Sequence, residues 1–101
     1  MSNGVQPMAP AIPLTMVVSE GTNLYAVRSD NSIWFAKGVL PLVWQSIPSV
    51  PNAENPVWIG TTLGAIRPPP YKKTQHMFIV TNKGNLWSWD GTNWNAQNTP
   101  N

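Results

Sequence analysis

Leu24-Tyr-Ala-Val-Arg-Ser-Asp-Asn-Ser-Ile-Trp34 recurs later in the chain as Met77-Phe-Ile-Val-Thr-Asn-Lys-Gly-Asn-Leu-Trp87. In each copy, a run of apolar, β-branched and aromatic residues leads into a polar turn and then into a second run that ends on tryptophan. This pattern is typical of a β-hairpin. Both copies continue to a glycine and a further tryptophan, Trp44 in the first and Trp94 in the second. A hairpin unit repeated about every 50 residues predicts a solenoid, a propeller or an array.

The rest of the chain also predicts short strands. No window has an apolar period of 3.6 residues, and the 11 prolines would interrupt long helices. We therefore predict an all-β chain with two four-stranded propeller blades: an extended arm over 1–13, a first blade-like repeat over 14–50 and a second over 51–101. The predicted strands are Thr15–Ser19, Leu24–Arg28, Ser32–Ala36, Val43–Ile47, Val57–Thr61, Leu63–Ile66, Met77–Asn82, Asn85–Trp89 and Trp94–Gln97.

Two blades cannot close a propeller, which needs roughly 4–8 blades before its blade faces are covered. The ring must then be completed by homo-oligomerisation, and a trimer with six blades is the most economical closed assembly. A monomeric β-sandwich is the alternative, and it is disfavoured because two units with the same strand order would leave sheet edges exposed.

Composition narrows the classes of partner. Charged residues make up 10% of the chain, against roughly 25% in soluble domains, and the net charge is +2. Lys72 and Lys73 form the only adjacent basic pair, so no nucleic-acid partner is expected. The chain has no cysteine, which excludes disulfides and thiolate metal sites, and neither a metal nor a cofactor is expected.

Targeting signals give little information. The first 13 residues lack the basic and apolar regions of a signal peptide, and no stretch approaches a membrane span of about 20 apolar residues. The expectation is a soluble protein, either cytoplasmic or released without a classical signal, whose location the sequence leaves unknown.

The first hairpin and the segment Gly84-Asn-Leu-Trp-Ser-Trp-Asp-Gly-Thr-Asn-Trp94 resemble the repeats of β-propeller lectins of the tectonin and tachylectin-2 type. The two-unit layout and Trp89-Asp-Gly-Thr-Asn-Trp94 are similar to small bacterial fucose-binding lectins, which form six-bladed trimers. The resemblance implies sugar binding in shallow sites within or between blades. Fucose itself is disfavoured, because Thr81 stands where the second repeat would need an arginine and the strands that contain Trp34 and Trp87 carry no glutamate.

Lectins stack a sugar ring on an indole and direct amide, carboxylate or guanidinium groups at its hydroxyls. The segment 87–94 combines these groups in one turn. The candidate ligand-binding residues are Arg28, Trp34, Trp44, Trp87, Trp89, Asp90, Asn93 and Trp94. The alternative is that the tryptophans pack between blades, that Asp90-Gly91 serves a tight turn and that the chain is a non-catalytic interaction or assembly subunit.

Catalysis is not expected. The four carboxylates, Glu20, Asp30, Glu54 and Asp90, all fall in predicted turns or connectors, so no acid–base pair is evident. The single histidine, His76, has no nearby cysteine or carboxylate in sequence and is interpreted as a surface or strand-start residue. The segment Arg67-Pro-Pro-Pro-Tyr-Lys-Lys73 is interpreted as a rigid loop between strands, with a proline-motif ligand for an aromatic groove as the alternative.

Overall fold

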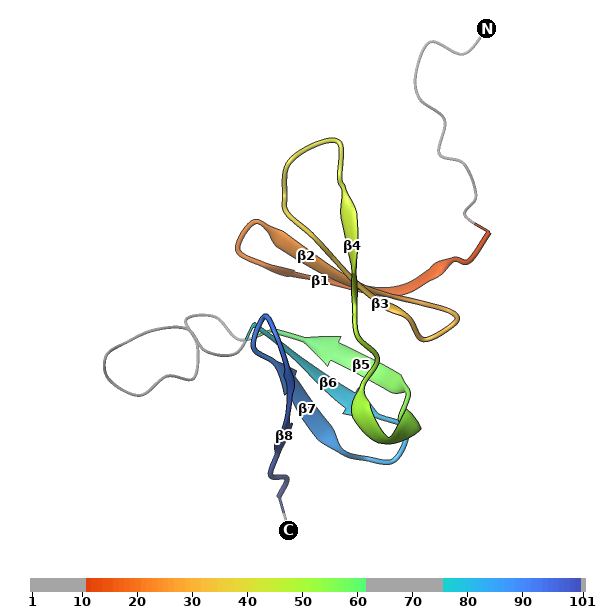
Figure 1. The fold of residues 1–101 in the computed structure, drawn as a ribbon, viewed down its shortest axis with the longest axis vertical. Helices are drawn as coiled ribbons and strands as arrows, with labels where there is room; N and C mark the ends of the chain where they lie inside the picture. The colour runs from red at the N-terminus through yellow and green to blue at the C-terminus, as the bar shows by residue number, and fades with distance from the viewer. Residues whose placement is uncertain (1–10, 62–75, 101) are drawn as a thin grey trace, which may run out of the picture.

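The computed structural model describes residues 11–61 and 76–100, which form two four-stranded antiparallel sheets (Figure 1). In each sheet the strands lie in sequence order. The first sheet contains β1 (Leu14–Glu20), β2 (Asn23–Arg28), β3 (Ile33–Ala36) and β4 (Trp44–Ile47), and the second contains β5 (Pro56–Gly60), β6 (Met77–Thr81), β7 (Leu86–Trp89) and β8 (Trp94–Gln97). A short 3-10 helix, Pro51–Ala53, lies in the connector between the sheets.

The predicted all-β class and the two four-stranded units are confirmed, and each strand boundary in the described residues agrees with its prediction to within one residue. The proposed strand Leu63–Ile66 and the proline-rich segment 67–73 lie outside the described residues.

The central hairpins of the two sheets have the same turn. The Arg28 amide donates to the Ser32 carbonyl at 3.0 Å, and the Thr81 amide donates to the Asn85 carbonyl at 2.9 Å. Asn31 and Gly84 have φ values of 69° and 79° at the same place in each turn. Glycine and asparagine are the residues that adopt this left-handed conformation most readily, so the turn chemistry of the sequence selects this loop.

The first strand of each sheet is also irregular at the same place. The pairing of β1 with β2 shifts between Leu14 and Met16, and the pairing of β5 with β6 shifts between Pro56 and Trp58. A bulge changes which side chains face each side of a sheet. Because both sheets have it at the same position, their equivalent residues lie on equivalent faces, and the two sheets are one structural unit formed twice.

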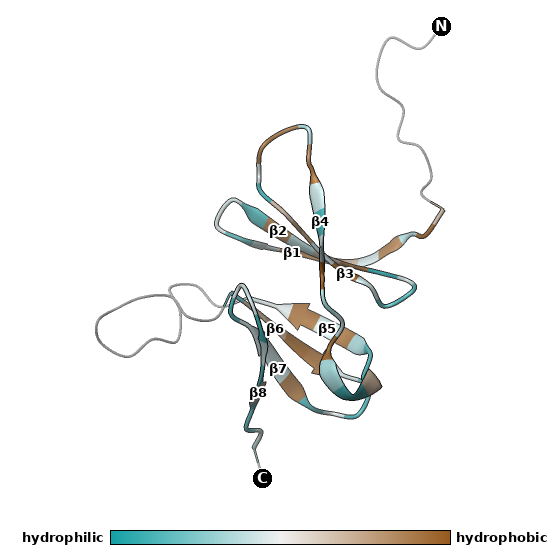
Figure 2. Cartoon of the chain, viewed as in Figure 1, coloured by the Kyte–Doolittle hydropathy of each residue, from teal (hydrophilic) through white to brown (hydrophobic). Residues whose placement is uncertain are grey.

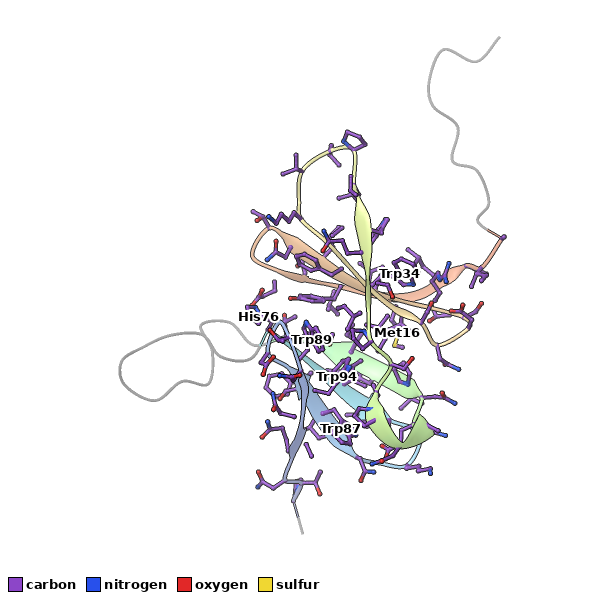
Figure 3. The ribbon with its side chains drawn as sticks, in the orientation of Figure 1. Met16, Trp34, His76, Trp87, Trp89 and Trp94 are labelled. Atoms are coloured by element: carbon purple, nitrogen blue, oxygen red, sulfur yellow. The ribbon has the colours of Figure 1, made fainter. Side chains whose placement is uncertain are left out.

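The sheets stack face to face around one apolar core. They come closest at β1 and β5, where the Thr61 hydroxyl donates to the Ser19 carbonyl at 2.9 Å. Figure 3 shows Met16 of β1 between the two sheets, and Figure 2 shows the apolar strands that meet there. The buried members of this core are Tyr25, Val27, Ile33, Ile47, Val50, Ile59, Met77, Ile79 and Trp89.

The connector between the sheets is fastened to the second sheet. The buried Glu54 carboxylate accepts hydrogen bonds from the Thr81 hydroxyl at 2.6 Å, the Asn85 amide at 2.9 Å and the Trp87 indole at 3.2 Å. The Thr81 bond is the largest of the effects that hold the pKa of Glu54 below its usual value, so the carboxylate stays charged. Three donors around this carboxylate account for its burial.

Candidate functional site

A cleft of about 290 Å³ opens between the two sheets. One wall comes from the face of the first sheet that also forms the core, and the other comes from the ends of β6 and β7. Its lining residues are Asn23, Tyr25, Phe35, Gln45, Ser46, Ile47, His76, Trp89 and Gly91. Strand register explains the first wall, because Tyr25, Phe35 and Gln45 are cross-strand partners on β2, β3 and β4 and so share one face.

The apolar part of the lining consists of three aromatic side chains and Ile47. The Tyr25 and Phe35 rings lie 5.2 Å apart at a tilt of 45°, and across the cleft Trp89 lies 5.2 Å from Trp94. Burial, and secondarily the negative charge of Glu20, raises the pKa of Tyr25 to about 12. Tyr25 is 3% exposed, so its neutral phenol contributes little surface to the cleft.

The polar part consists of two neutral amides, Ser46 and one imidazole. Gln45 is exposed and Asn23 is half-buried, so both side chains are accessible to a ligand. The Nδ1 atom of His76 lies 3.7 Å from Glu20 Oε1. Gly91 has a φ of 99°, and a Cβ there would lie 3.4 Å from His76 Nε2, so glycine both permits the turn and leaves the imidazole accessible.

The three candidate tryptophans of the second repeat point into the core rather than to solvent (Figure 3). Trp89 is 7% exposed and reaches the cleft only as part of its wall. Trp87 donates to Glu54, and the Trp94 indole donates to the Pro48 carbonyl at 2.8 Å. Their alternation is as expected, since Trp87 and Trp89 face the core while Ser88 faces the other side.

Asp90 shapes the turn between β7 and β8. Its Oδ1 atom accepts from the Thr92 amide at 2.8 Å and the Asn93 amide at 2.6 Å, and its Oδ2 atom accepts from the Asn95 side chain at 3.1 Å. The bond from the Asn93 amide is the main reason that the pKa of Asp90 lies below its usual value. The interpretation of Asp90-Gly91 as a tight turn is supported, and Asn93 contributes its backbone to that turn.

Arg28 and Trp34 come together in the first repeat. The Arg28 guanidinium lies 4.7 Å from the centroid of the Trp34 ring and 3.2 Å from Asp30 Oδ2, while the Trp34 indole donates to the Ser32 hydroxyl at 2.9 Å. This cluster lies at the β2–β3 turn, on the opposite side of the view from the β7–β8 turn (Figure 1). Arg28 therefore does not join Asp90 in one site. Trp44 is half-buried on the sheet face opposite the cleft.

Sequence reasoning missed most of the cleft. Tyr25, Phe35 and Gln45 have a detectable signal, because alternation along three strands places them on one face. The contribution of His76 has no local signal, since its neighbour Glu20 is distant in sequence and only the stacking of the sheets brings the two together.

A second hollow of about 250 Å³ adjoins the cleft and shares Phe35 and Gln45 with it. It is formed by the long β3–β4 loop, whose tip is apolar (Figure 2). Leu40 at this tip is 83% exposed.

Comparisons with protein-family models, with curated protein sequences and with solved structures found no significant match to this chain. Within the described residues, no helix is long and apolar enough to cross a membrane.

Proposed function

We propose that the protein is a carbohydrate-binding lectin that presents several shallow sugar sites on a homo-oligomeric β-propeller. The observation that carries the proposal is the cleft between the sheets, where the half-buried Phe35 ring lies beside neutral amides. An aromatic ring offers a stacking surface to the apolar face of a sugar, and amide groups both donate to and accept from hydroxyls. The lectin resemblance implies shallow sites, so affinity would come from several copies acting together.

Assembly follows from the blade count. Each chain contributes two four-stranded sheets, and three chains would supply the six blades of a closed ring. In this arrangement the clefts repeat around the ring, and a multivalent glycan can engage more than one of them.

A glycan array probed with the intact chain tests the proposal, followed by titration of the best hit. We expect Gln45→Ala to weaken binding, because this exposed side chain lines the cleft and removing it leaves the core untouched. Asn98→Ala is the matched control, since it removes an exposed amide elsewhere. Affinity should change little with salt, because a neutral sugar releases no counterions. An array without hits, measured on an intact oligomer, would reject the lectin.

The second candidate is a non-catalytic assembly or interaction subunit without a small ligand. It is favoured by one specific observation, namely that the indole N–H groups of Trp34, Trp87 and Trp94 all donate within the chain. An indole whose polar group is satisfied internally acts as a packing element. Under this candidate the oligomer forms, but no glycan binds.

A further inference from the structure

Each sheet has two faces, and the repeat makes the faces of the two sheets comparable. We define the Tyr25-type face as the side of the first sheet that carries Tyr25 and Phe35, together with the equivalent side of the second sheet, which carries Phe78 and Ser88. The opposite side is the Trp87-type face. It carries Trp87, Trp89 and Trp94 in the second sheet, and Trp34, Ala36 and Trp44 in the first.

The two sheets bury different faces against each other. The first sheet contributes its Tyr25-type face to the core, and the second sheet contributes its Trp87-type face. The contact inside the chain is therefore head-to-tail. One face of each type is left over, namely the Trp87-type face of the first sheet and the Tyr25-type face of the second, and the core of the described residues covers neither of them.

The leftover faces carry apolar side chains at positions whose equivalents lie in the core. Ile59 of β5 is a core residue and Met16 of β1 packs against the core, on the two strands where the sheets come closest. The shared bulge aligns Met16 with Trp58, and it aligns Ile59 with Val17. Trp58 and Val17 are 52% and 49% exposed. Each leftover face therefore exposes an apolar side chain at a position whose equivalent is packed inside the chain, as expected of a surface that another copy covers.

Both faces are prepared for burial. The Trp58 ring lies across Gly60, where a Cβ would approach its Cη2 atom to 2.2 Å, so the indole extends flat along the sheet. On the same face the buried Ser88 hydroxyl accepts from the Gln97 amide at 2.8 Å, which satisfies a polar group at the centre of the surface. On the other face Arg28 covers Trp34 and is paired with Asp30. A polar group that already has a partner costs less to bury.

We propose that the Tyr25-type face of the second sheet binds the Trp87-type face of the first sheet of another copy of this chain, with Trp58 beside the partner copy's Val17. This contact repeats between chains the head-to-tail contact that each chain makes internally. Such a contact closes into a ring when its rotation divides the circle, and three two-sheet copies give the six-bladed ring. The inference rests on the oligomeric part of the proposed function and names the surfaces that produce it.

Disulfide trapping tests the contact directly, because the chain contains no cysteine. In the double variant Trp58→Cys/Val17→Cys, oxidation should join neighbouring copies, and a non-reducing denaturing gel should show dimers and trimers that return to monomers on reduction. Each single variant is the control and should show far less trimer. A double variant that remains monomeric on the gel overturns the proposal.

Native mass measurement gives a second test that does not depend on cross-linking. Trp58→Glu and Val17→Lys should each raise the dissociation constant of the oligomer by about tenfold or more, because each places a charge in an apolar contact. The combination of the two should regain part of the loss through opposite charges. Leu40→Glu is the control, since Leu40 is exposed on the β3–β4 loop and lies off both faces.

The outcomes separate this inference from the lectin proposal. The inference would be overturned, even if glycans bind, by a wild-type protein that is monomeric or by Trp58→Glu and Val17→Lys variants that keep the wild-type oligomer mass. A trimer that dissociates in these variants supports the inference even if the glycan array is empty, and the lectin alone then fails. Circular dichroism of each variant checks that the chain remains folded.

Discussion

Trp89 belongs to the core and also lines the cleft. Its replacement by alanine should lower the free energy of unfolding by about 3–5 kcal/mol. The side chain is 7% exposed, belongs to the core between the sheets and lies 5.2 Å from the Trp94 ring. A buried aromatic side chain of this size removes about 200 Å² from water, which at about 25 cal/mol per Å² corresponds to about 5 kcal/mol, and alanine retains a small part of that.

A loss of this size is large for a chain of 101 residues, because domains are stable by only about 5–15 kcal/mol. Trp89→Ala should therefore be close to unfolding at room temperature. Trp89→Phe should lose less, since it keeps an aromatic ring against Trp94. Leu40→Ala is the control for removal of an exposed apolar side chain, and it should change stability by less than about 0.5 kcal/mol.

Urea unfolding followed by far-ultraviolet circular dichroism is the appropriate assay, because tryptophan fluorescence would change with the substitution itself. All variants should be compared at one chain concentration, since association adds to apparent stability. If the Trp89→Ala midpoint corresponds to a loss below about 1 kcal/mol, the assignment of Trp89 to the core is refuted.

Three further predictions follow from the turns and the cleft. Hydrogen bonds lower the pKa of Asp30, Glu54 and Asp90 in the folded state. The stability that these carboxylates contribute is therefore present above the pKa values of the unfolded chain, near pH 4, and is lost as the pH falls toward the folded pKa values. Melting temperatures measured between pH 6 and pH 3 should drop, and Asp90→Asn should make part of that drop smaller. Gly84→Ala should cost about 1–2 kcal/mol in thermal melts, because φ is 79° at this position. A Cβ there meets nothing within 4 Å, so the cost comes from the backbone conformation alone. Gly84→Asn should cost less, because Asn31 occupies the equivalent position of the first sheet, and equal costs would contradict the backbone explanation. A glycan that binds the cleft should saturate at one per chain by calorimetry, because a cleft formed between copies by the proposed contact would have Ser88 and Ala36 at the positions of Phe35 and Trp89. A ratio of two per chain would contradict this.

The repeat made most of the fold predictable. Strand positions follow from local alternation and from the turn residues, and these are properties of short segments. Asn31 and Gly84 sit where the hairpin turn needs a left-handed residue, so the turns were evident before any packing was known. The bulge in the first strand of each sheet was not predicted, because no local signal marks the extra residue.

The candidate site was less predictable. The segment 87–94 has the highest density of aromatic and polar groups, yet its tryptophans pack into the core and its aspartate organises a turn. Aromatic residues near polar ones describe both a ligand platform and a core strand beside a turn, and sequence density does not distinguish the two. The cleft instead takes Tyr25 and Phe35 from one repeat and His76 from the other.

Trp34 and Trp87 distinguish what the sequence determines from what only the tertiary structure decides. The sequence alone determines that both lie at the same point of the same hairpin, because alternation and turn chemistry act within a few residues. Only the stacking of the sheets decides that Trp87 packs against the core and donates its indole N–H to Glu54, while Trp34 lies on the face that the core leaves over, beneath Arg28. The physical reason is that burial depends on which surface arrives from elsewhere in the chain, and that contact joins residues far apart in sequence.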